Sequence, residues 1–492
     1  MDTGMNILIA VAELTPLVSS GGLADVVNSL SKAWKAAGHN PVIVLPKHAK
    51  IDVKKYNFKP IDKTICIPVS YWMEYAKLWT GYLPGSDVPV YLVENSDYFD
   101  REGIYGNPNE YQDNDRRFIF FSRAVFETAK SINFVPDILH AHDYHTAFTM
   151  AFLKTHYRND PFFSHCAGVF TIHNLAYQGW FRPETAMIYA CFGTDGFKGS
   201  WFEKNDSVNC MKTGIMFADK ITTVSPTYSR EIRWDSFSEG LQYELNSRGG
   251  DLIGVLNGAD YSTWNPQTDS YIDTKYSVDS LQNKQKNKEK FLREHNMDLG
   301  NMLNLPLIGM VTRLAEQKGI DILMHSLEYN LYHSRFFFCL LGSGAEQYEE
   351  YFNYLAWKYP NKISVHIGFN HELSHRIIAS SDFLLLPSRF EPCGLTQMYA
   401  LKYGTIPIVR STGGLSDTVQ EYTTYNRNGN GFLFINYNSD DMEFAIRRGM
   451  DIYYNTEHWD KVRANAMNCN FSITRAAAKY IEVFNWALEK IN

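Results

Sequence analysis

Cysteine is sparse in this chain of 492 residues, and a positive net charge and long apolar runs are lacking. Its seven cysteines form no C-x-x-C pair or other metal-type spacing, so we expect no disulfide framework, and a reducing compartment fits best. Strongly apolar runs such as residues 336–341 are far shorter than the ~18–20 residues that cross a bilayer. No secretion signal is visible near the N-terminus. These absences predict a cytoplasmic protein that works without a membrane.

Acidic residues outnumber basic ones, 54 Asp and Glu against 47 Lys and Arg, which gives a formal net charge of −7. Because no long basic block is present either, the electrostatic signature of a nucleic-acid-binding protein is missing. Hydrophobic residues at 45% and charged residues at 21% are typical of a soluble globular protein and exclude a disordered or fibrous chain. An acidic ligand would therefore have to be bound by a few local cations.

Short apolar runs rich in β-branched and aromatic residues recur between longer helical patterns, as in parallel α/β proteins. The first series of predicted buried strands is 6–12, 42–45, 88–93, 138–142, 169–173 and 221–225. The second series is 307–311, 336–341, 363–367, 383–387 and 406–409. We predict the α/β class with two open, parallel sheets, one in each half of the chain, and sheets of this kind place a ligand cleft between the domains.

A polar segment at 261–290, rich in lysine and asparagine, separates the two series of strands. We place the domain junction near 258–266, so the predicted domains are residues 1–260 and 261–471. The lysines of 261–290 are expected to form a solvated helix face.

Two amphipathic helices are visible from apolar residues at three- and four-residue spacings. The first begins near Leu23 and stops at Gly38. The second covers 472–491, and its apolar stripe must dock on another surface.

Each half of the chain contains a glycine pair that leads into an apolar helix, Gly21 and Gly22 in the first and Gly413 and Gly414 in the second. Glycine lets a backbone approach a ligand closely, and the N–H groups at a helix start favour phosphate or sugar oxygens. One such pair alone is more typical of a tight strand-to-helix turn. Its recurrence in both halves favours a nucleotide-linked sugar held between two loops.

Two cations follow the predicted strand 307–311, at the end where parallel sheets bind ligands. Arg313 can bind a pyrophosphate through two hydrogen bonds and Lys318 acts as a point charge. Together they can stabilise a departing diphosphate without a metal. A pair of surface charges at a helix start is the alternative interpretation.

The histidine-rich segment 140–145 has the composition of a divalent-metal site. No second cluster would supply further ligands, so hydrogen bonding to a sugar or to the backbone is the preferred interpretation. Strand alternation places His140 and His142 on the same face, with Asp143 at the strand end. The D-x-D pattern that starts at Asp113 precedes a helical pattern, so Asp113 is predicted to cap that helix.

A histidine and a carboxylate also stand at predicted strand ends. His173 ends one strand in the segment T-I-H-N, and Glu391 follows the very apolar run 383–387. Such groups can orient a sugar and share the charge of a transition state. A buried structural histidine or a salt-bridged glutamate is the commoner case for either residue alone.

Taken together, these motifs resemble those of the bacterial-type glycogen and starch synthases, retaining glucosyltransferases with two Rossmann-like domains in the GT-B arrangement. The resemblance runs nearly end to end and includes G-G-L-A-D-V at 21–26, T-I-H-N-L-A-Y-Q-G at 171–179, V-L-N-G-A-D at 255–260 and P-S-R-F-E-P-C-G-L-T-Q at 387–397. It implies transfer of glucose from ADP-glucose or UDP-glucose to the non-reducing end of an α-1,4-glucan, with retention and with no metal or other cofactor. The two domains would face each other across a deep cleft, and helix 472–492 would dock back on the first.

The resemblance also implies roles for single residues. Arg313 and Lys318 would bind the diphosphate, and Glu391 would contact the donor glucose from the second domain. The residues implied to surround the same sugar from the first domain are His173, Asp143 and Asn257. The other implied donor-binding residues are Gly21, Gly22 and Asp25, Phe369 stacked on the base, and Thr412, Gly413, Gly414 and Leu415 through backbone groups.

One position departs from the family pattern. The first glycine loop of the family usually reads K-x-G-G-L, whereas Ser19 stands here in place of the lysine. Losing a cation directed at a diphosphate weakens donor binding. One hypothesis is an active synthase, which the retention of Arg313, Lys318, His173 and Glu391 favours. The other is a non-catalytic glucan-binding or regulatory protein on the same fold.

Overall fold

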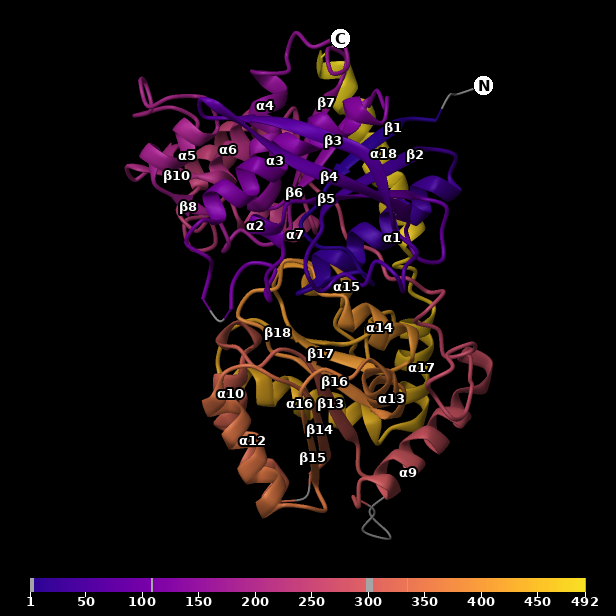
Figure 1. Cartoon of the computed structure of the whole chain (residues 1–492). Coiled ribbons are helices and arrows are strands. Elements are labelled where there is room, and N and C mark those ends of the chain that lie inside the picture. The colour runs from indigo at the N-terminus through magenta and orange to yellow at the C-terminus, as the bar shows by residue number, and fades with distance from the viewer. Residues whose placement is uncertain (1–3, 108, 298–303, 334, 492) are drawn as a thin grey trace. The chain divides into compact units, whose positions relative to one another are not determined.

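The structure is a computed structural model in which residues 4–107, 109–297, 304–333 and 335–491 are described. The chain divides into two compact units, and Figure 1 labels their elements. Unit 1 comprises Met1–Val255 with Ile473–Asn492, and unit 2 comprises Leu256–Ser472. Among the described residues, no helix combines the length and the apolar character that crossing a membrane requires.

Unit 1 is built on a mixed sheet whose described strands run in the order β12-β11-β7-β6-β1-β2-β5-β4-β3. Neighbours from β12 to β5 pair in parallel, whereas β4 pairs antiparallel with both β5 and β3. The strands are β1 (Asn6–Ala10), β2 (Asn40–Pro46), β3 (Lys59–Val69), β4 (Trp72–Tyr82), β5 (Pro89–Glu94), β6 (Ile138–His142), β7 (Ala167–Ile172), β11 (Lys220–Thr223) and β12 (Leu252–Gly254). All six strands predicted for the first series lie in this sheet.

Helices and a small antiparallel sheet complete unit 1. The small sheet has the order β8-β10-β9, formed by β8 (Trp180–Phe181), β9 (Glu203–Lys204) and β10 (Ser207–Asn209). The helices are α1 (Gly22–Ala36), α2 (Ser96–Phe99), α3 (Asn114–Ser131), α4 (Phe148–Lys154), α5 (Pro183–Tyr189), α6 (Cys210–Phe217), α7 (Pro226–Glu231), α8 (Gln242–Ser247) and α18 (Ile473–Ile491). Asp113 occupies the N-cap position of α3 as predicted, but its carboxylate pairs with Arg101 at 2.7 Å and does not cap the helix.

The C-terminal helix α18 packs on α1 and on the sheet of unit 1. Tyr480 and Phe484 are fully buried, and their ring centroids lie 5.8 and 5.3 Å from that of Trp34 in α1. The indole Nε1 of Trp34 donates a hydrogen bond to the backbone oxygen of Ala477 at 3.1 Å. His140 of β6 contacts the same two rings at 5.4 and 5.3 Å. The predicted apolar stripe therefore docks beside the strand that carries the histidine-rich segment.

Replacing Phe484 with alanine is expected to lower the free energy of unfolding by about 3–5 kcal/mol, because the change leaves a cavity in a fully buried aromatic cluster. Urea unfolding followed by tryptophan fluorescence measures this loss. The matched control is Trp486→Ala on an exposed position of the same helix, which should cost less than half as much. Equal losses for the two variants would contradict the docking of α18 through its buried stripe.

Unit 2 contains a parallel sheet whose described strands run in the order β15-β14-β13-β16-β17-β18. The strands are β13 (Leu307–Val311), β14 (Phe337–Gly342), β15 (Ile363–Ile367), β16 (Phe383–Leu386), β17 (Ile406–Arg410) and β18 (Phe432–Phe434). The helices are α9 (Lys284–Glu294), α10 (Ile320–Met324), α11 (Leu327–Tyr332), α12 (Glu346–Lys358), α13 (His371–Ser380), α14 (Thr396–Lys402), α15 (Gly413–Thr418), α16 (Ser439–Tyr453) and α17 (Thr456–Met467). All five strands predicted for the second series are confirmed.

The strands of unit 2 are buried on both faces, as β14 shows. Phe338 and Leu340 belong to one core cluster, whereas Phe337, Cys339 and Leu341 belong to another. Successive side chains of a strand point to opposite faces, so apolar packing on both faces requires an uninterrupted apolar run.

The expectation that the lysines of 261–290 form a solvated face is wrong for two of them. Lys284 is buried and donates a hydrogen bond to the backbone oxygen of Ala379 at 2.8 Å. Lys288 is also buried and forms an ion pair with Asp382 at 2.6 Å. Burial lowers the pKa of the Lys284 amine well below its usual value. Long lysine stems reach interior acceptors, which the polar helical pattern does not reveal.

Candidate active-site residues in the two units

The first glycine loop leaves open space at the start of α1. Gly21 is the N-cap with a φ of −163°, and a Cβ added at Gly21 or Gly22 would meet no described atom within 4 Å. Neither the backbone conformation nor packing therefore requires glycine, which leaves room for a ligand. Glu13 supports the loop, because its Oε2 accepts hydrogen bonds from the Ser20 hydroxyl at 2.9 Å and from the Ser20 amide. Asp25 is exposed in the first turn of the helix.

Asp143 and His173 are brought together at the carboxyl ends of β6 and β7. The backbone amide of His173 donates a hydrogen bond to Oδ1 of Asp143 at 2.8 Å. Asp143 has a φ of 55°, a conformation that residues other than glycine rarely adopt and that clusters at functional sites. Burial raises the pKa of its carboxyl to about 7.

This raised pKa predicts a pH dependence of stability that Asp143→Asn removes. The unfolded chain releases the proton near the ordinary aspartate pKa, whereas the folded chain keeps it up to about pH 7. The folded state therefore binds more protons in this window, so stability falls as the pH rises toward 7 and then levels off. The wild type should lose stability relative to Asp143→Asn by up to roughly 1.4 kcal/mol per pH unit across the window.

Urea unfolding at pH 5, 6, 7 and 8 checks this prediction. Asparagine keeps an oxygen that can accept the hydrogen bond from the His173 amide but cannot bind a proton in this pH range. The difference between the two proteins therefore reports the proton bound to the Asp143 carboxyl. Asp137→Asn is the matched control, because Asp137 also accepts from a backbone amide, at 2.7 Å, but is less buried. Parallel stability curves for the wild type and Asp143→Asn would contradict the buried, proton-binding carboxyl.

The histidine-rich segment forms a buried network of hydrogen bonds. Nδ1 of His142 lies 3.0 Å from Nε2 of His173, and Nε2 of His140 lies 2.7 Å from the Thr171 hydroxyl. His140 and His142 share one face, with ring centroids 4.1 Å apart, as strand alternation predicted. Burial lowers the pKa of His173 to about 3, so its ring is neutral at physiological pH. It is suited to hydrogen bonding with a sugar hydroxyl and does not supply a cation.

No group of three or more His, Cys, Asp or Glu side chains in the described part of the chain is arranged to hold a metal ion.

In unit 2, Lys318 and Glu391 form an ion pair. The Lys318 Nζ lies 2.6 Å from Oε2 of Glu391, although the residues are 73 positions apart. They follow β13 and β16, which are neighbours in the sheet. The Ser388 hydroxyl donates to the same carboxylate oxygen at 3.0 Å. Both charged side chains are largely buried, so this pair is a preorganised, charge-balanced centre at the carboxyl end of the sheet.

Arg313 and Phe369 follow β13 and β15 of the same sheet, and both are exposed. Arg313 comes after β13, and its guanidinium makes no hydrogen bond or ion pair with the described residues. Five N–H donors are therefore available to an anion. Phe369 follows β15 and is 91% exposed. A ring this exposed offers a flat apolar surface to a ligand.

The structure requires glycine at the second glycine pair, unlike at the first. Gly413 has a φ of 45°, and a Cβ there would lie 1.9 Å from the backbone oxygen of Glu391. The amide of Gly414 donates to that same oxygen at 3.1 Å, and the amide of Leu415 donates to the oxygen of the buried Thr412 at 3.1 Å. The backbone amides of Gly414 and Leu415, two of the groups that the resemblance implies would meet the phosphates or the glucose, are thus already hydrogen-bonded within unit 2. The glycines instead let the start of α15 support the loop that carries Glu391.

Asn257 belongs to unit 2, whereas the predicted domain boundary placed it in the first domain. The backbone just after it is tied to this unit, since the amide of Ala259 donates to the oxygen of Phe471 at 2.7 Å. Oδ1 of Asn257 is buried and has no hydrogen-bond partner among the described residues. Buried polar atoms without partners are uncommon, so this acceptor is a place where a ligand donor would fit.

Sequence reasoning missed two supporting residues, Glu13 and Ser388. Glu13 lies in an irregular loop, where no periodic pattern signals a role. Ser388 stands three positions before Glu391 in the recognised P-S-R-F-E stretch, and that spacing was the available signal. The histidine-rich composition did mark His142, but not its contact with His173.

Comparison with known proteins identifies the family. Residues 6–247 match the model of the starch synthase catalytic domain, and residues 294–466 match that of the glycosyl transferases group 1. Glycogen synthase of Bacillus cereus is 41% identical over 485 residues, which cover 99% of this chain and 100% of that protein. Glycogen synthase 1 of Geobacter sulfurreducens is also 41% identical, with 99% and 97% covered. The chain belongs to the glycogen and starch synthase family.

Solved structures agree with this family assignment. The catalytic domain of starch synthase IV from Arabidopsis thaliana, bound to ADP and acarbose, matches with a TM-score of 0.90 and 31% identity, covering 99% of this chain and 100% of that one. A sucrose-phosphate synthase from Thermosynechococcus elongatus, 14% identical with a TM-score of 0.60, shares the fold alone. This member of the synthase family is a glycosyltransferase with the two-domain α/β GT-B fold. The family match favours the catalytic hypothesis over the non-catalytic one.

Proposed function

We propose that the chain transfers glucose from ADP-glucose to the non-reducing end of an α-1,4-glucan, with retention of the anomeric configuration and without a metal. The observation that carries the proposal is the Lys318–Glu391 pair at 2.6 Å, with the unpaired Arg313 in the same loop region after β13. A protein that only binds glucan has no physical need of two cations at the carboxyl end of a sheet. The likeness to glycogen synthases over the full chain supports the sugar class.

The two cations of unit 2 fit the costly step of the reaction. Breaking the bond between the anomeric carbon and the diphosphate puts negative charge on the leaving group. Arg313 can donate two parallel hydrogen bonds to it, and Lys318 keeps N–H donors beyond the one that faces Glu391. Charges that are already in place stabilise such a transition state without reorganisation, so these side chains perform the role that a metal fills elsewhere.

The environment of Glu391 supports same-face attack. Its carboxylate is neutralised by Lys318 and accepts a hydrogen bond from Ser388, so it is a poor nucleophile. It suits hydrogen bonding to the donor sugar, with the neutral His173 and Asp143 as further sugar partners. Retention then proceeds through a short-lived oxocarbenium-like species, in contrast to the two-carboxylate double displacement.

The choice of ADP-glucose rests on two observations. The starch synthase IV relative is bound to ADP and acarbose. Phe369, with 91% of its side chain exposed, is the residue that we propose stacks on the adenine ring.

Transfer assays with each donor test the proposal. Radiolabelled ADP-glucose and UDP-glucose are supplied separately with maltotriose, and proton NMR assigns the configuration of the new linkage. We expect an α linkage and at least tenfold faster transfer from ADP-glucose. Phe369→Ala should raise the KM for the donor and leave the KM for the acceptor unchanged, whereas Phe444→Ala, an exposed control on α16, should change neither. A β-linked product would contradict retention, and faster transfer from UDP-glucose would contradict the donor assignment.

A further inference from the structure

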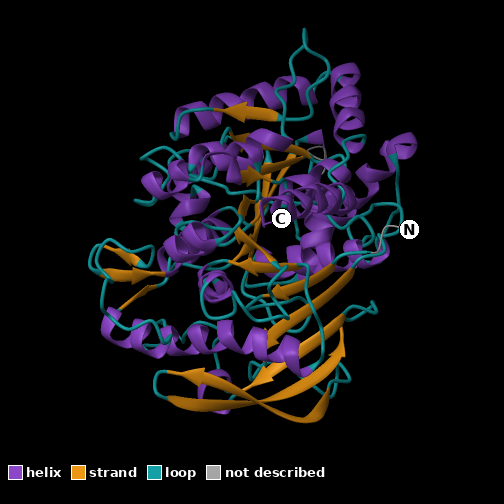
Figure 2. Cartoon of the chain, turned by 90° about the horizontal axis from the view of Figure 1, so that it is seen from above, coloured by secondary structure: helices purple, strands orange, loops and turns teal. Residues whose placement is uncertain are grey.

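The tip of the β3–β4 hairpin exposes four large apolar side chains. Tyr71 is 93% exposed, Tyr75 60%, Trp72 53% and Met73 51%. In Figure 2 the hairpin forms two long strands at the lower margin of the picture, and α3 packs against the inner side of β3. Met73 and Tyr75 share the outer face of the hairpin, opposite Pro68 and Cys66, whereas Trp72 stands opposite the buried Val69 on the inner face. Single exposed apolar residues are ordinary, but neighbouring ones on one face mark an interaction site.

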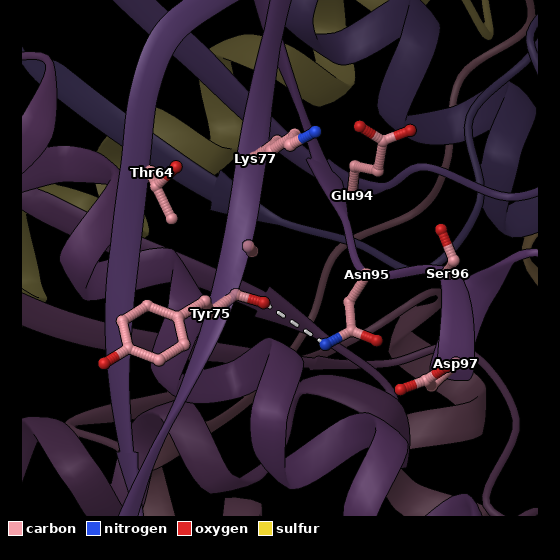
Figure 3. Close-up of a pocket in the computed structure, with 8 residues that line it drawn as sticks. Thr64, Tyr75, Lys77, Glu94, Asn95, Ser96 and Asp97 are labelled. Atoms are coloured by element: carbon pink, nitrogen blue, oxygen red, sulfur yellow. Dashed lines mark hydrogen bonds between the residues drawn. The ribbon is translucent and has the colours of Figure 1, made fainter.

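A pocket of about 340 Å³ adjoins this apolar group. Figure 3 shows Thr64, Tyr75, Lys77 and Asp97 around it, so a hydroxyl, a phenol ring, an ammonium and a carboxylate border one space. The Asn95 side chain is fixed at its edge, because Nδ2 donates to the backbone oxygen of Tyr75 at 3.3 Å. The pocket therefore places donors and acceptors beside an exposed aromatic ring.

The charged side chains of the pocket differ in whether they already have hydrogen-bond or ion-pair partners. Glu94 is committed to its neighbours, because it pairs with Lys47 at 2.9 Å and accepts from Nε1 of Trp79 at 3.0 Å. The ammonium of Lys77 and the carboxylate of Asp97 make no hydrogen bond or ion pair with any residue in the described ranges. One open cation and one open anion balance each other, so the pocket does not select a strongly charged ligand.

An uncharged polyhydroxyl ligand with apolar faces fits these features. The hydroxyls of a pyranose can both donate and accept, while its C–H face packs on an aromatic ring. An anionic polymer or a lipid headgroup would need an excess of cations, which the pocket does not have. Given the proposed function, on which this inference rests, the available polymer of this chemistry is the α-1,4-glucan acceptor.

We propose that Tyr71, Met73, Tyr75, Lys77 and Asp97, here called the hairpin site, bind an α-1,4-glucan chain apart from the reacting residues. In the sheet order, β4 lies four positions from β6, the strand that leads to the candidate active-site loop, which is about 19 Å at the usual strand spacing. A long glucan held there keeps its chain ends at a high effective concentration, whereas a short acceptor gains nothing.

Native electrophoresis in gels containing glycogen tests the hairpin site in the full chain. Tyr75→Ala should raise the apparent dissociation constant for glycogen at least fivefold, and Met73→Ala, on the same face of the hairpin, should raise it in the same direction. Tyr425→Ala is the matched control, since it removes an exposed tyrosine of unit 2. Retardation of Tyr75→Ala equal to that of the wild type would overturn the proposal.

Cys66 offers a local probe of the same surface. It is exposed and directly opposite Tyr75 in the β3–β4 register, whereas the other cysteines are buried or half-buried. Saturating maltoheptaose should slow alkylation of Cys66 by iodoacetamide at least threefold, measured by mass spectrometry of the peptide that contains it. An unchanged alkylation rate would mean that glucan does not occupy this face.

Transfer to maltotriose separates this inference from the proposed function. The hairpin variants should transfer glucose from ADP-glucose to maltotriose at the wild-type rate, which also reports that they are folded. Weaker retardation of the variants in glycogen gels, with unchanged transfer to maltotriose, supports the hairpin site. If the hairpin variants are retarded by glycogen as strongly as the wild type, and glucan does not protect Cys66, the hairpin site is wrong although the enzyme is active. If the wild type transfers glucose to no acceptor, the proposed function is wrong.

Discussion

Replacing Lys318 with methionine is expected to lower kcat/KM for glucose transfer about a hundredfold to a thousandfold. The ammonium is one of the two cations that we assign to the leaving diphosphate, and removing one preorganised donor from a developing anion costs rate of this order. Methionine keeps a similar length and apolar stem, so the change removes charge and hydrogen bonding more than volume. Steady-state rates with ADP-glucose and maltotriose measure the effect.

Two further variants show whether the loss arises at the diphosphate. Lys318→Met also leaves Glu391 without its partner at 2.6 Å, and an uncompensated carboxylate can itself disturb the site. The double variant Lys318→Met with Glu391→Gln removes that charge and should remain slow. Lys358→Met breaks an exposed pair with Glu328 and should retain the wild-type rate. A loss below tenfold for Lys318→Met, or recovery in the double variant, would contradict a direct role at the diphosphate.

Restoring lysine at Ser19 is expected to lower the KM for ADP-glucose about tenfold to a hundredfold. A hydrogen bond to a charged group contributes about 1.5–3 kcal/mol, which corresponds to a change of this size. Ser19 is exposed next to Gly21, where a Cβ would meet no described atom, so a long side chain has space. Initial rates over a range of donor concentrations measure the change.

Ser19→Met is the control, because it adds length without charge and should leave the donor KM unchanged. Two other lysines of unit 1, Lys47 and Lys212, already have partners. Lys47 pairs with Glu94 at 2.9 Å, and Nζ of Lys212 donates to the backbone oxygen of Glu203 at 2.5 Å. An unchanged KM for Ser19→Lys would mean that this loop does not face the diphosphate.

The parallel strands could be predicted from the sequence because they are buried on both faces. The five-residue run of β13 coincides with its prediction, and β14 shows why, since its alternate residues pack in two different core clusters. The β3–β4 hairpin was not predicted, because a strand with one open face mixes polar and apolar residues and lacks a continuous apolar run. Thr64 and Cys66 are exposed while Ile65 and Ile67 are buried.

For the candidate site, the sequence indicated residue types and strand ends but not contacts. Arg313, Lys318 and Glu391 could be placed at one sheet edge, because the carboxyl ends of parallel strands meet there. The ion pair between residues 73 apart depends on which strands are neighbours, and that order is set by packing of the whole unit. The same holds for Asn257, whose place follows from backbone pairing near Phe471.

The most direct test of the central claim is transfer of labelled glucose from ADP-glucose to glycogen by the full chain in the presence of EDTA. We expect steady elongation through α-1,4 linkages at the same rate with and without the chelator, and near-complete loss of this activity in Lys318→Met. If the chain transfers no glucose from ADP-glucose or UDP-glucose but still binds glycogen, the proposed function is wrong. The chain would then be a glucan-binding protein on a synthase fold.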